Sequence, residues 1–402
     1  MILYIILFIF LSCILFLGYI RIKYKFWALQ PVFHFYDLHY WFIDAGIICK
    51  ELPTQNKYYQ PKIQTLQFEN VPEYKLTKAT QFIQTQYIQN KEYKENKFIP
   101  KKENMLPYFI GHNSKCFWSF FYGPLLIQDT KTNTIIEDTK IISILTTRPL
   151  HVEIINNSNK TKNITMDVYY VDYLCVDETQ RKQGIAPQMI QTHEYNQRHS
   201  NKQICVSLFK REDELTGIIP LCAYDTYGFN IKNWRKPQDL PSSVTFLLCD
   251  KQNMYYLMDF IKQHKLKFDI CILPEISNII ELIETKNIFI YMLMNETTIC
   301  SVYFFRKTCT YVKTNEEVLS CFASINATSS EKVFIHGFKV AFWKIKEKYD
   351  DYKYLLVENI SNNTCIINNL IIKTRPTISK TAYFFYNFAY HTFKSNKVFI
   401  LN

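Results

Sequence analysis

The stretch "VDYLCVDETQRKQGIAP", residues 171–187, joins a strand-like run, a short basic turn and the start of a helix. The run that leads into the turn, 164–176, is rich in β-branched and aromatic residues and predicts a central strand. The segment 186–199 has helical character, and Pro187 lies in its first turn, where a proline costs least. The stretch therefore predicts a strand, a turn and a helix in direct succession.

The turn itself has the composition of a phosphate-binding loop. N–H groups at the start of a helix point toward an incoming anion, and the helix dipole reinforces the attraction. Gly184 allows a close approach of the backbone, while Arg181 and Lys182 add positive charge. A pattern this short also occurs by chance, so the interpretation depends on its position between a strand and a helix.

Composition narrows the classes of partner. At 402 residues the chain is long enough for two domains, and its 48% hydrophobic and 21% charged residues are typical of a packed globular protein. The net charge of +11 favours nucleic acid, a membrane surface or a phosphorylated cofactor as partner, although a solvated basic surface gives the same charge. Because no basic block interleaved with aromatics, zinc-finger spacing or helix-turn-helix pattern occurs, we expect no nucleic acid.

The cysteines and histidines predict neither a disulfide framework nor a metal site. The twelve cysteines form no CxxC pair and have no regular spacing, which is typical of free thiols in a reducing compartment. No HExxH motif or Cys/His cluster occurs, so we expect no metal.

The beginning of the chain reads as a membrane anchor. Residues 1–20, "MILYIILFIFLSCILFLGYI", are apolar almost throughout, and as a helix they would rise about 30 Å, the thickness of a bilayer core. Arg21, Lys23 and Lys25 follow directly, whereas a signal peptide carries its charge before the apolar stretch. This basic flank predicts a single-pass anchor with the rest of the chain in the cytoplasm.

The remaining sequence divides into an arm, 21–60, and two α+β units, 61–235 and 236–402. Proline and charge in the segment 228–243 place the boundary near residue 236. In the first unit, 139–155 reads as a strand, a turn and a second strand. In the second unit we expect strands at 244–249, 268–273, 288–294, 298–305 and 317–325, then a helix at 338–349.

Four segments resemble the N-myristoyltransferase family. "LCVDETQRKQGIAPQMI" (174–190) resembles the family signature L-C-V-x-x-x-L-R-x-K-R-x-A-P-x-L-I, and "YKFWALQPV" (24–32) resembles Y-K-F-W-x-T-Q-P-V. "YFFYNF" (383–388) and the ending "KVFILN" (397–402) are weaker matches. The four occur in the family's order and cover nearly all the chain after the anchor. That order argues against the alternative for "YKFW", an aromatic belt at the membrane surface.

The resemblance implies an α+β fold of two tandem GNAT-like (acyl-CoA N-acyltransferase) domains with mixed sheets flanked by helices. The unit 61–235 would bind acyl-CoA, 236–402 would supply most of a peptide groove, and the arm 21–60 would close over the cofactor. The implied donor is myristoyl-CoA, without a metal, and the implied acceptor is the N-terminal glycine of a protein. We expect a monomer.

The resemblance also assigns residues. The backbone N–H groups of Tyr173 and Leu174 would form an oxyanion hole, and the terminal carboxylate of Asn402 would act as general base. The implied acyl-CoA contacts are Tyr24, Lys25, Phe26, Trp27, Leu174, Cys175, Val176, Arg181, Lys182, Gln183, Gly184, Ile185, Ala186 and Pro187.

Three departures from the family pattern leave the acceptor open. Gln183 and Gly184 replace a basic pair, no counterpart of a family threonine is evident in 206–213, and Leu356 falls where the family has asparagine. The alternatives are an acyltransferase with another amine, such as lysine, or another acyl chain, and a binding protein without turnover. The last would be favoured if Asn402 were buried away from the pocket.

Overall fold

The structure, a computed structural model, describes residues 2–42, 45–87, 97–128, 135–155, 163–212, 217–313, 316–349 and 351–402. The helices are α1 (Ile2–Lys23), α2 (Leu38–Phe42), α3 (Glu73–Gln86), α4 (Lys102–Met105), α5 (Ile185–Ser200), α6 (Met254–His264), α7 (Ile276–Glu284), α8 (Glu331–Lys348) and α9 (Asn363–Ile371). The strands are β1 (Gly46–Ile47), β2 (Gln64–Gln67), β3 (Lys97–Phe98), β4 (Phe117–Gln128), β5 (Ile135–Ile154), β6 (Ile164–Val176), β7 (Val206–Glu212), β8 (Cys222–Asn230), β9 (Val244–Leu248), β10 (Ile270–Leu273), β11 (Ile288–Asn295), β12 (Thr298–Lys313), β13 (Glu316–Asn326), β14 (Tyr352–Glu358), β15 (Thr377–Tyr386), β16 (Phe388–Ala389) and β17 (Val398–Ile400).

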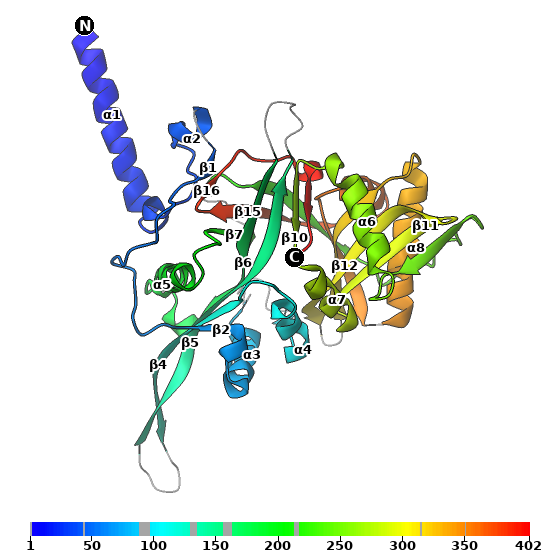
Figure 1. The fold of residues 1–402 in the computed structure, drawn as a ribbon, viewed down its shortest axis with the longest axis horizontal. Coiled ribbons are helices and arrows are strands. Elements are labelled where there is room, and N and C mark those ends of the chain that lie inside the picture. Colours follow the sequence, from blue (N-terminus) through cyan, green and yellow to red (C-terminus); the bar gives the residue numbers. More distant parts are fainter. Residues whose placement is uncertain are drawn as a thin grey trace.

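One mixed sheet runs through the molecule in the order β17-β10-β5-β6-β7-β15-β8-β14-β13-β12-β11-β9, with β4 also paired to β5 (Figure 1). The late strands β10 and β17 join the sheet beside β5, and the early strand β8 pairs with β14 and β15. Strands that come before residue 236 in the sequence therefore pair with strands that come after it, at two places in the sheet. The boundary near 236 stays a prediction.

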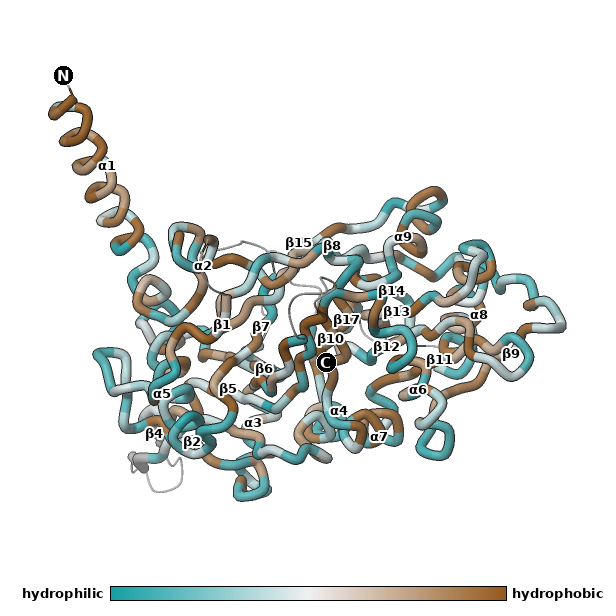
Figure 2. Tube along the Cα trace, turned by 45° about the horizontal axis from the view of Figure 1, so that its top comes forward, coloured by the Kyte–Doolittle hydropathy of each residue, from teal (hydrophilic) through white to brown (hydrophobic). Residues whose placement is uncertain are grey.

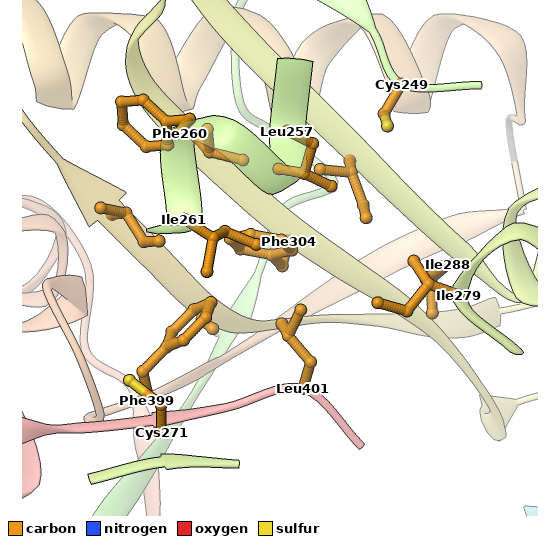
Figure 3. Packing of buried hydrophobic residues seen from close by; sticks show 14 of the residues in the cluster. Cys249, Leu257, Phe260, Ile261, Cys271, Ile279, Ile288, Phe304, Phe399 and Leu401 are labelled. Atoms are coloured by element: carbon orange, nitrogen blue, oxygen red, sulfur yellow. The ribbon is translucent and has the colours of Figure 1, made fainter. Parts of the chain in front are cut away.

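Side chains of the second half alternate between two helical layers, as a buried strand requires. On β12, Val302 and Phe304 pack toward α6 and α7, whereas Tyr303 and Phe305 pack toward α8 and α9. Figure 3 shows the first of these clusters, in which Leu401 at the end of the chain lies among side chains of α6, α7 and β12. This packing holds the last residues in the middle of the molecule, where Figures 1 and 2 show the C-terminus.

In the first half, α3 and α5 pack against opposite faces of the sheet formed by β4, β5 and β6. Phe82 of α3 belongs to the cluster with Trp118 and Ile144, and Met189 of α5 belongs to the cluster with Ile142 and Leu145. Both helices are thereby fixed against the strand that precedes the basic turn. The helix α5 begins at Ile185, one residue before the expected start.

Two sequence-based expectations need correction. Residues 139–155 do not turn, because β5 is continuous to Ile154. Pairing with β4 ends at Thr147 and pairing with β10 begins at His151, so Pro149 lies where one edge of β5 has no partner strand. A proline interrupts a sheet least at such a place. The expected strands of the second half and β6 are confirmed.

The other correction concerns α8, which begins at Glu331 rather than at residue 338. The side chain of Ser330 caps it by accepting the N–H of Val333. Gly337 interrupts the helical sequence pattern, yet it suits the packing, because a Cβ at this position would lie 2.5 Å from the hydroxyl of Tyr303 and force that side chain to move.

The helix α1 is exposed along nearly all of its length and apolar throughout, as Figure 2 shows. It is long and apolar enough to cross a membrane, although a signal sequence has the same properties. The twelve cysteines, all within the described ranges, are free thiols.

Candidate functional site

The site begins where two parallel strands separate. β6 and β7 pair from Val168 opposite Val206 to Val171 opposite Phe209, and no further. Both strands nevertheless continue, with β6 paired to β5 as far as Val176 and β7 paired to β15. The sheet is therefore open between the second half of β6 and the end of β7.

A β-bulge lies at the point of separation. Leu145 pairs with Leu174 and Thr147 pairs with Val171, so two residues of β6, Asp172 and Tyr173, lie opposite the single residue Thr146. The N–H of Tyr173 donates to the side-chain oxygen of Thr146 at 3.2 Å instead of to a backbone carbonyl. A bulge of this kind redirects side chains and removes backbone groups from the ladder.

A cavity of about 310 Å³, the inter-strand cavity, fills the opening between β6 and β7. Trp27 from the arm closes it by stacking on Phe209, with ring centroids 5.7 Å apart. The lining is Trp27, Tyr87, Leu145, Thr147, Val171, Asp172, Leu174, Ile190, His193, Glu194, Ser207, Phe209, Lys210, Arg211 and Tyr386.

Two buried titratable groups of α5 border this cavity. His193 contacts the hydroxyls of Ser119 and Thr147 at 2.8 and 2.9 Å, and burial lowers its pKa to about 3, so it is neutral. Burial raises the pKa of Glu194 to about 7 despite the guanidinium of Arg198 at 3.7 Å. On the α5 side of the cavity, His193 is therefore neutral at neutral pH and Glu194 is partly protonated.

The basic turn has the backbone shape that its glycine suggested. Lys182 and Gly184 adopt positive φ angles of 66° and 80°, and α5 begins directly afterwards without a side-chain cap. Lys182, Gln183 and Gly184 are exposed. Arg181 is tied to the backbone, since it donates to the carbonyls of Val176 at 3.2 Å and Gln86 at 2.7 Å.

The remaining residues expected at the cofactor lie on β6, on α5 and in the arm. Ala186 and Pro187 lie in the partly exposed first turn of α5, whereas Ile185 and Cys175 are buried in the hydrophobic clusters on either face of the sheet. In the arm, Trp27 lines the cavity. Its neighbour Phe26 packs against Tyr58, Lys25 is exposed, and the carbonyl of Tyr24 accepts the N–H of Ala28.

A second cavity of about 250 Å³, the central cavity, lies between the two halves. Its lining includes Arg148, Tyr173, Lys210, Arg306, Leu356, Glu358 and Asn402. Tyr87, Asp172 and Lys210 line both cavities, so the two cavities are neighbours beside the bulge. Asn402 thus lies at the cavity and not away from it.

Charged side chains of the central cavity form a network. Arg306 donates to the backbone oxygen of Asn402 at 2.8 Å and to Glu358 at 3.0 Å. Glu358 also pairs with Lys210 at 3.1 Å and accepts from the hydroxyl of Tyr224. Burial alone would raise the pKa of Glu358, but Lys210 and Arg306 hold it below its ordinary value.

The sequence reasoning missed Arg148, Asp172, Lys210, Arg306 and Glu358. Each lies on a strand of apolar character, and a charge within such a run was the available signal. Which of these charges meet could not be read from the chain, because they come from five different strands. Among the described residues, no group of three or more His, Cys, Asp or Glu side chains is placed to hold a metal ion.

Sequence comparison finds no matching family profile and no matching curated protein. The fold, in contrast, is similar to solved structures. Saccharomyces cerevisiae N-myristoyltransferase with bound myristoyl-CoA matches with a TM-score of 0.69 at 12% identity, over 92% of this chain and 94% of the yeast chain. A tandem GNAT protein from the clavulanic acid biosynthesis pathway matches with a TM-score of 0.52 at 7% identity, over 80% and 98% of the two chains.

Both likenesses extend over most of this chain and therefore concern the fold as a whole. The protein therefore has the N-myristoyltransferase fold, that of two GNAT-like units in tandem, preceded here by an apolar helix.

Proposed function

We propose that the protein transfers a myristoyl group from myristoyl-CoA to the N-terminal glycine amine of other proteins. The observation that carries this proposal is that two cavities lie on either side of shared lining residues, at the bulge of Asp172 and Tyr173. One cavity lies in a splayed sheet behind a helix N-terminus, and the other contains ionisable groups suited to an amine. An acyl donor and an acceptor can thus approach one point from opposite sides.

The donor enters between β6 and β7. Its phosphates bind the N–H groups at the start of α5 together with Lys182, and its acyl chain occupies the inter-strand cavity behind Trp27. The chemical fit supports this arrangement, because the cavity offers aromatic and aliphatic side chains while the exposed turn offers positive charge.

Transfer proceeds by direct attack. A carboxylate takes one proton from the glycine ammonium group, whose pKa is near 8, and the neutral nitrogen attacks the thioester carbonyl carbon. The new C–N bond gives a tetrahedral intermediate, and the C–S bond then breaks as the nitrogen gives its second proton to the departing sulfur of CoA. The N–H groups of Tyr173 and Leu174 stabilise the negative oxygen of the intermediate, with the Tyr173 N–H leaving Thr146 to do so.

The terminal carboxylate at Asn402 remains our proposal for the base. Its position at the central cavity supports this role and does not favour a binding protein without turnover. The alternative is an acyltransferase with another amine acceptor or another acyl chain. The inter-strand cavity, with a volume of about 310 Å³ and the polar side chains of His193 and Glu194 in its lining, also suits acyl groups other than myristoyl.

We further propose that α1 anchors the enzyme in a membrane, with the folded part in the cytoplasm. Phe16 of α1 contacts Phe35, with the ring centroids 6.0 Å apart. Figures 1 and 2 show α2 beside the C-terminal part of α1 and far from its N-terminus. Exposed Leu38, Trp41 and Phe42 of α2 then reach the interfacial region of the bilayer.

The test is release of CoA thiol on mixing the full-length protein in detergent with myristoyl-CoA and a glycine-starting peptide. A parallel protein carries a few extra residues after Asn402. Peptide-dependent release that the extension abolishes supports both the transfer and the base. Binding of myristoyl-CoA without any release contradicts the proposed function.

A further inference from the structure

The side chain of Arg148 is buried, and one of its terminal nitrogens has no hydrogen-bond partner among the described residues. Its Nε donates to Asp172 at 2.9 Å, and its guanidinium lies over the rings of Tyr108 and Tyr170 at 5.3 and 5.1 Å. Only 1% of the side chain is exposed, yet within the described part of the chain Nη1 has no hydrogen-bond partner. An enclosed donor without an acceptor is costly, so it indicates an oxygen atom that a ligand supplies.

Asp172, the partner of Arg148, lies at the junction of the two cavities and directly before Tyr173. Burial raises the pKa of this carboxyl, although Arg148 and Arg306 act against the rise. The central cavity is also lined by four tyrosines, by Cys309, and by the charged side chains of Lys210, Glu212, Arg306 and Glu358; the tyrosines are Tyr87, Tyr108, Tyr170 and Tyr173. A carboxylate in this position is suited to hold an ammonium group at the place where the thioester lies.

We propose that Arg148 and Asp172 together bind the α-amino and carbonyl groups of the acceptor, with the ammonium on Asp172 and the first carbonyl oxygen on Arg148. The inference rests on the proposed transfer and specifies its acceptor class. In a peptide N-terminus only the α-carbon and the carbonyl carbon lie between the amine nitrogen and the first carbonyl oxygen. A carboxylate and a guanidinium that are paired with each other can therefore bind both groups at once. A lysine side chain has no carbonyl near its amine and would leave Arg148 unpaired.

The pair therefore selects an N-terminal α-amine over a lysine side chain. Arg148 acts as a specificity residue for the carbonyl, and Asp172 fixes the amine beside the N–H groups of Tyr173 and Leu174. The base remains the carboxylate at Asn402, which lines the same cavity.

The test compares two acceptors, a glycine-starting peptide and the same peptide with its first amide replaced by a trans-alkene, which removes the carbonyl oxygen without adding a basic amine. The measured quantity is the ratio of kcat/KM for the first peptide to kcat/KM for the alkene peptide. For the wild type we expect this ratio to be roughly 10 to 100, because a hydrogen bond to a charged group is lost. In Arg148→Gln this ratio falls toward one. Arg148→Lys, which keeps a charge but has a single donor head, gives an intermediate ratio.

Arg235→Gln, an exposed arginine away from both cavities, is the matched control and keeps the wild-type ratio. A ratio that is unchanged in Arg148→Gln overturns the proposal. If Arg148→Gln does not fold, as judged by myristoyl-CoA binding, the wild-type and Arg148→Lys ratios decide. A wild-type ratio of one also overturns it.

Binding separates this inference from the proposed function. The full chain is saturated with a thioether analogue of myristoyl-CoA, which cannot transfer its acyl group, and both peptides are titrated by calorimetry. Tighter binding of the carbonyl peptide, lost in Arg148→Gln, supports the acceptor site even if no transfer occurs. Equal binding of both peptides contradicts the site even if transfer to some amine is found.

Discussion

Arg306 donates a hydrogen bond to the backbone oxygen of Asn402 at 2.8 Å, and this contact joins the end of the described chain to β12. The same guanidinium pairs with the carboxylate of Glu358, so one cation binds a buried carboxylate and the last backbone oxygen of the described chain. Leu401, the neighbour of Asn402, packs in the hydrophobic core of the second half, as Figure 3 shows. An ion network at Asn402 and hydrophobic packing at Leu401 thus hold this end of the described chain in place.

Removing Arg306 should destabilise the fold, because Glu358 would be left buried with fewer partners. For Arg306→Gln we expect the free energy of unfolding to fall by roughly 3–5 kcal/mol, as for other buried ion pairs that lose one member. The control is Lys236→Gln, whose pair with Glu347 is exposed and worth less than about 1 kcal/mol. Equal urea midpoints for the two variants would show that the network contributes no stability.

Acid should weaken the protein through His193. Because its folded pKa is lowered to about 3, its contribution to stability is complete above its ordinary pKa of about 6.5 and is lost as pH falls. Between pH 6.5 and 4 the loss is on the order of 3 kcal/mol. Glu194 acts in the opposite direction, since its raised pKa makes the fold more stable below about pH 7.

The difference between wild type and His193→Gln at each pH removes the contribution of Glu194. We expect urea unfolding to give a steeper loss with acid for the wild type than for the variant. If the free energies of unfolding of the wild type and His193→Gln changed by the same amount from pH 7.5 to 4, His193 would gain no charge on unfolding.

The turn before α5 should bind phosphates and not the acyl chain. A Cβ at Gly184 meets no atom within 4 Å, so Gly184→Ala strains only the backbone, by about 1–2 kcal/mol, and should fold. For this variant and for Lys182→Gln we expect a roughly three- to tenfold loss of affinity for myristoyl-CoA. Affinity for myristoyl-pantetheine, which lacks the phosphates of CoA, should not change.

Calorimetric titration of both ligands measures this difference, and the exposed Lys332→Gln serves as the control for charge. A loss of equal size for both ligands would place the phosphates elsewhere.

The helix α2 should contact lipid if α1 spans a bilayer. Trp41 is 45% exposed next to Phe42, which is 83% exposed. In vesicles with brominated acyl chains, we expect part of the tryptophan fluorescence of the full chain to be quenched, and Trp41→Phe to lose that part. Trp343→Phe on α8 should leave the quenched part intact. The same quenching in Trp41→Phe as in wild type would exclude insertion of α2.

Local pattern predicted the elements around the site but not the site's charges. The strand 164–176 and the following turn and helix have the expected order, because periodicity, glycine and proline act over a few residues. The continuity of β5 through Pro149 was not predictable, since it depends on where two neighbouring strands end. The pairing of Arg148 with Asp172 depends in the same way on the register between β5 and β6.

The central claim is direct transfer to an N-terminal α-amine, and mass spectrometry of both components tests it most directly. The full-length protein is mixed with myristoyl-CoA and a peptide that carries an N-terminal glycine and an internal lysine. We predict one myristoyl group on the glycine amine and an unmodified enzyme. A myristoyl group on the lysine or on the enzyme itself, or on no component, would contradict the account.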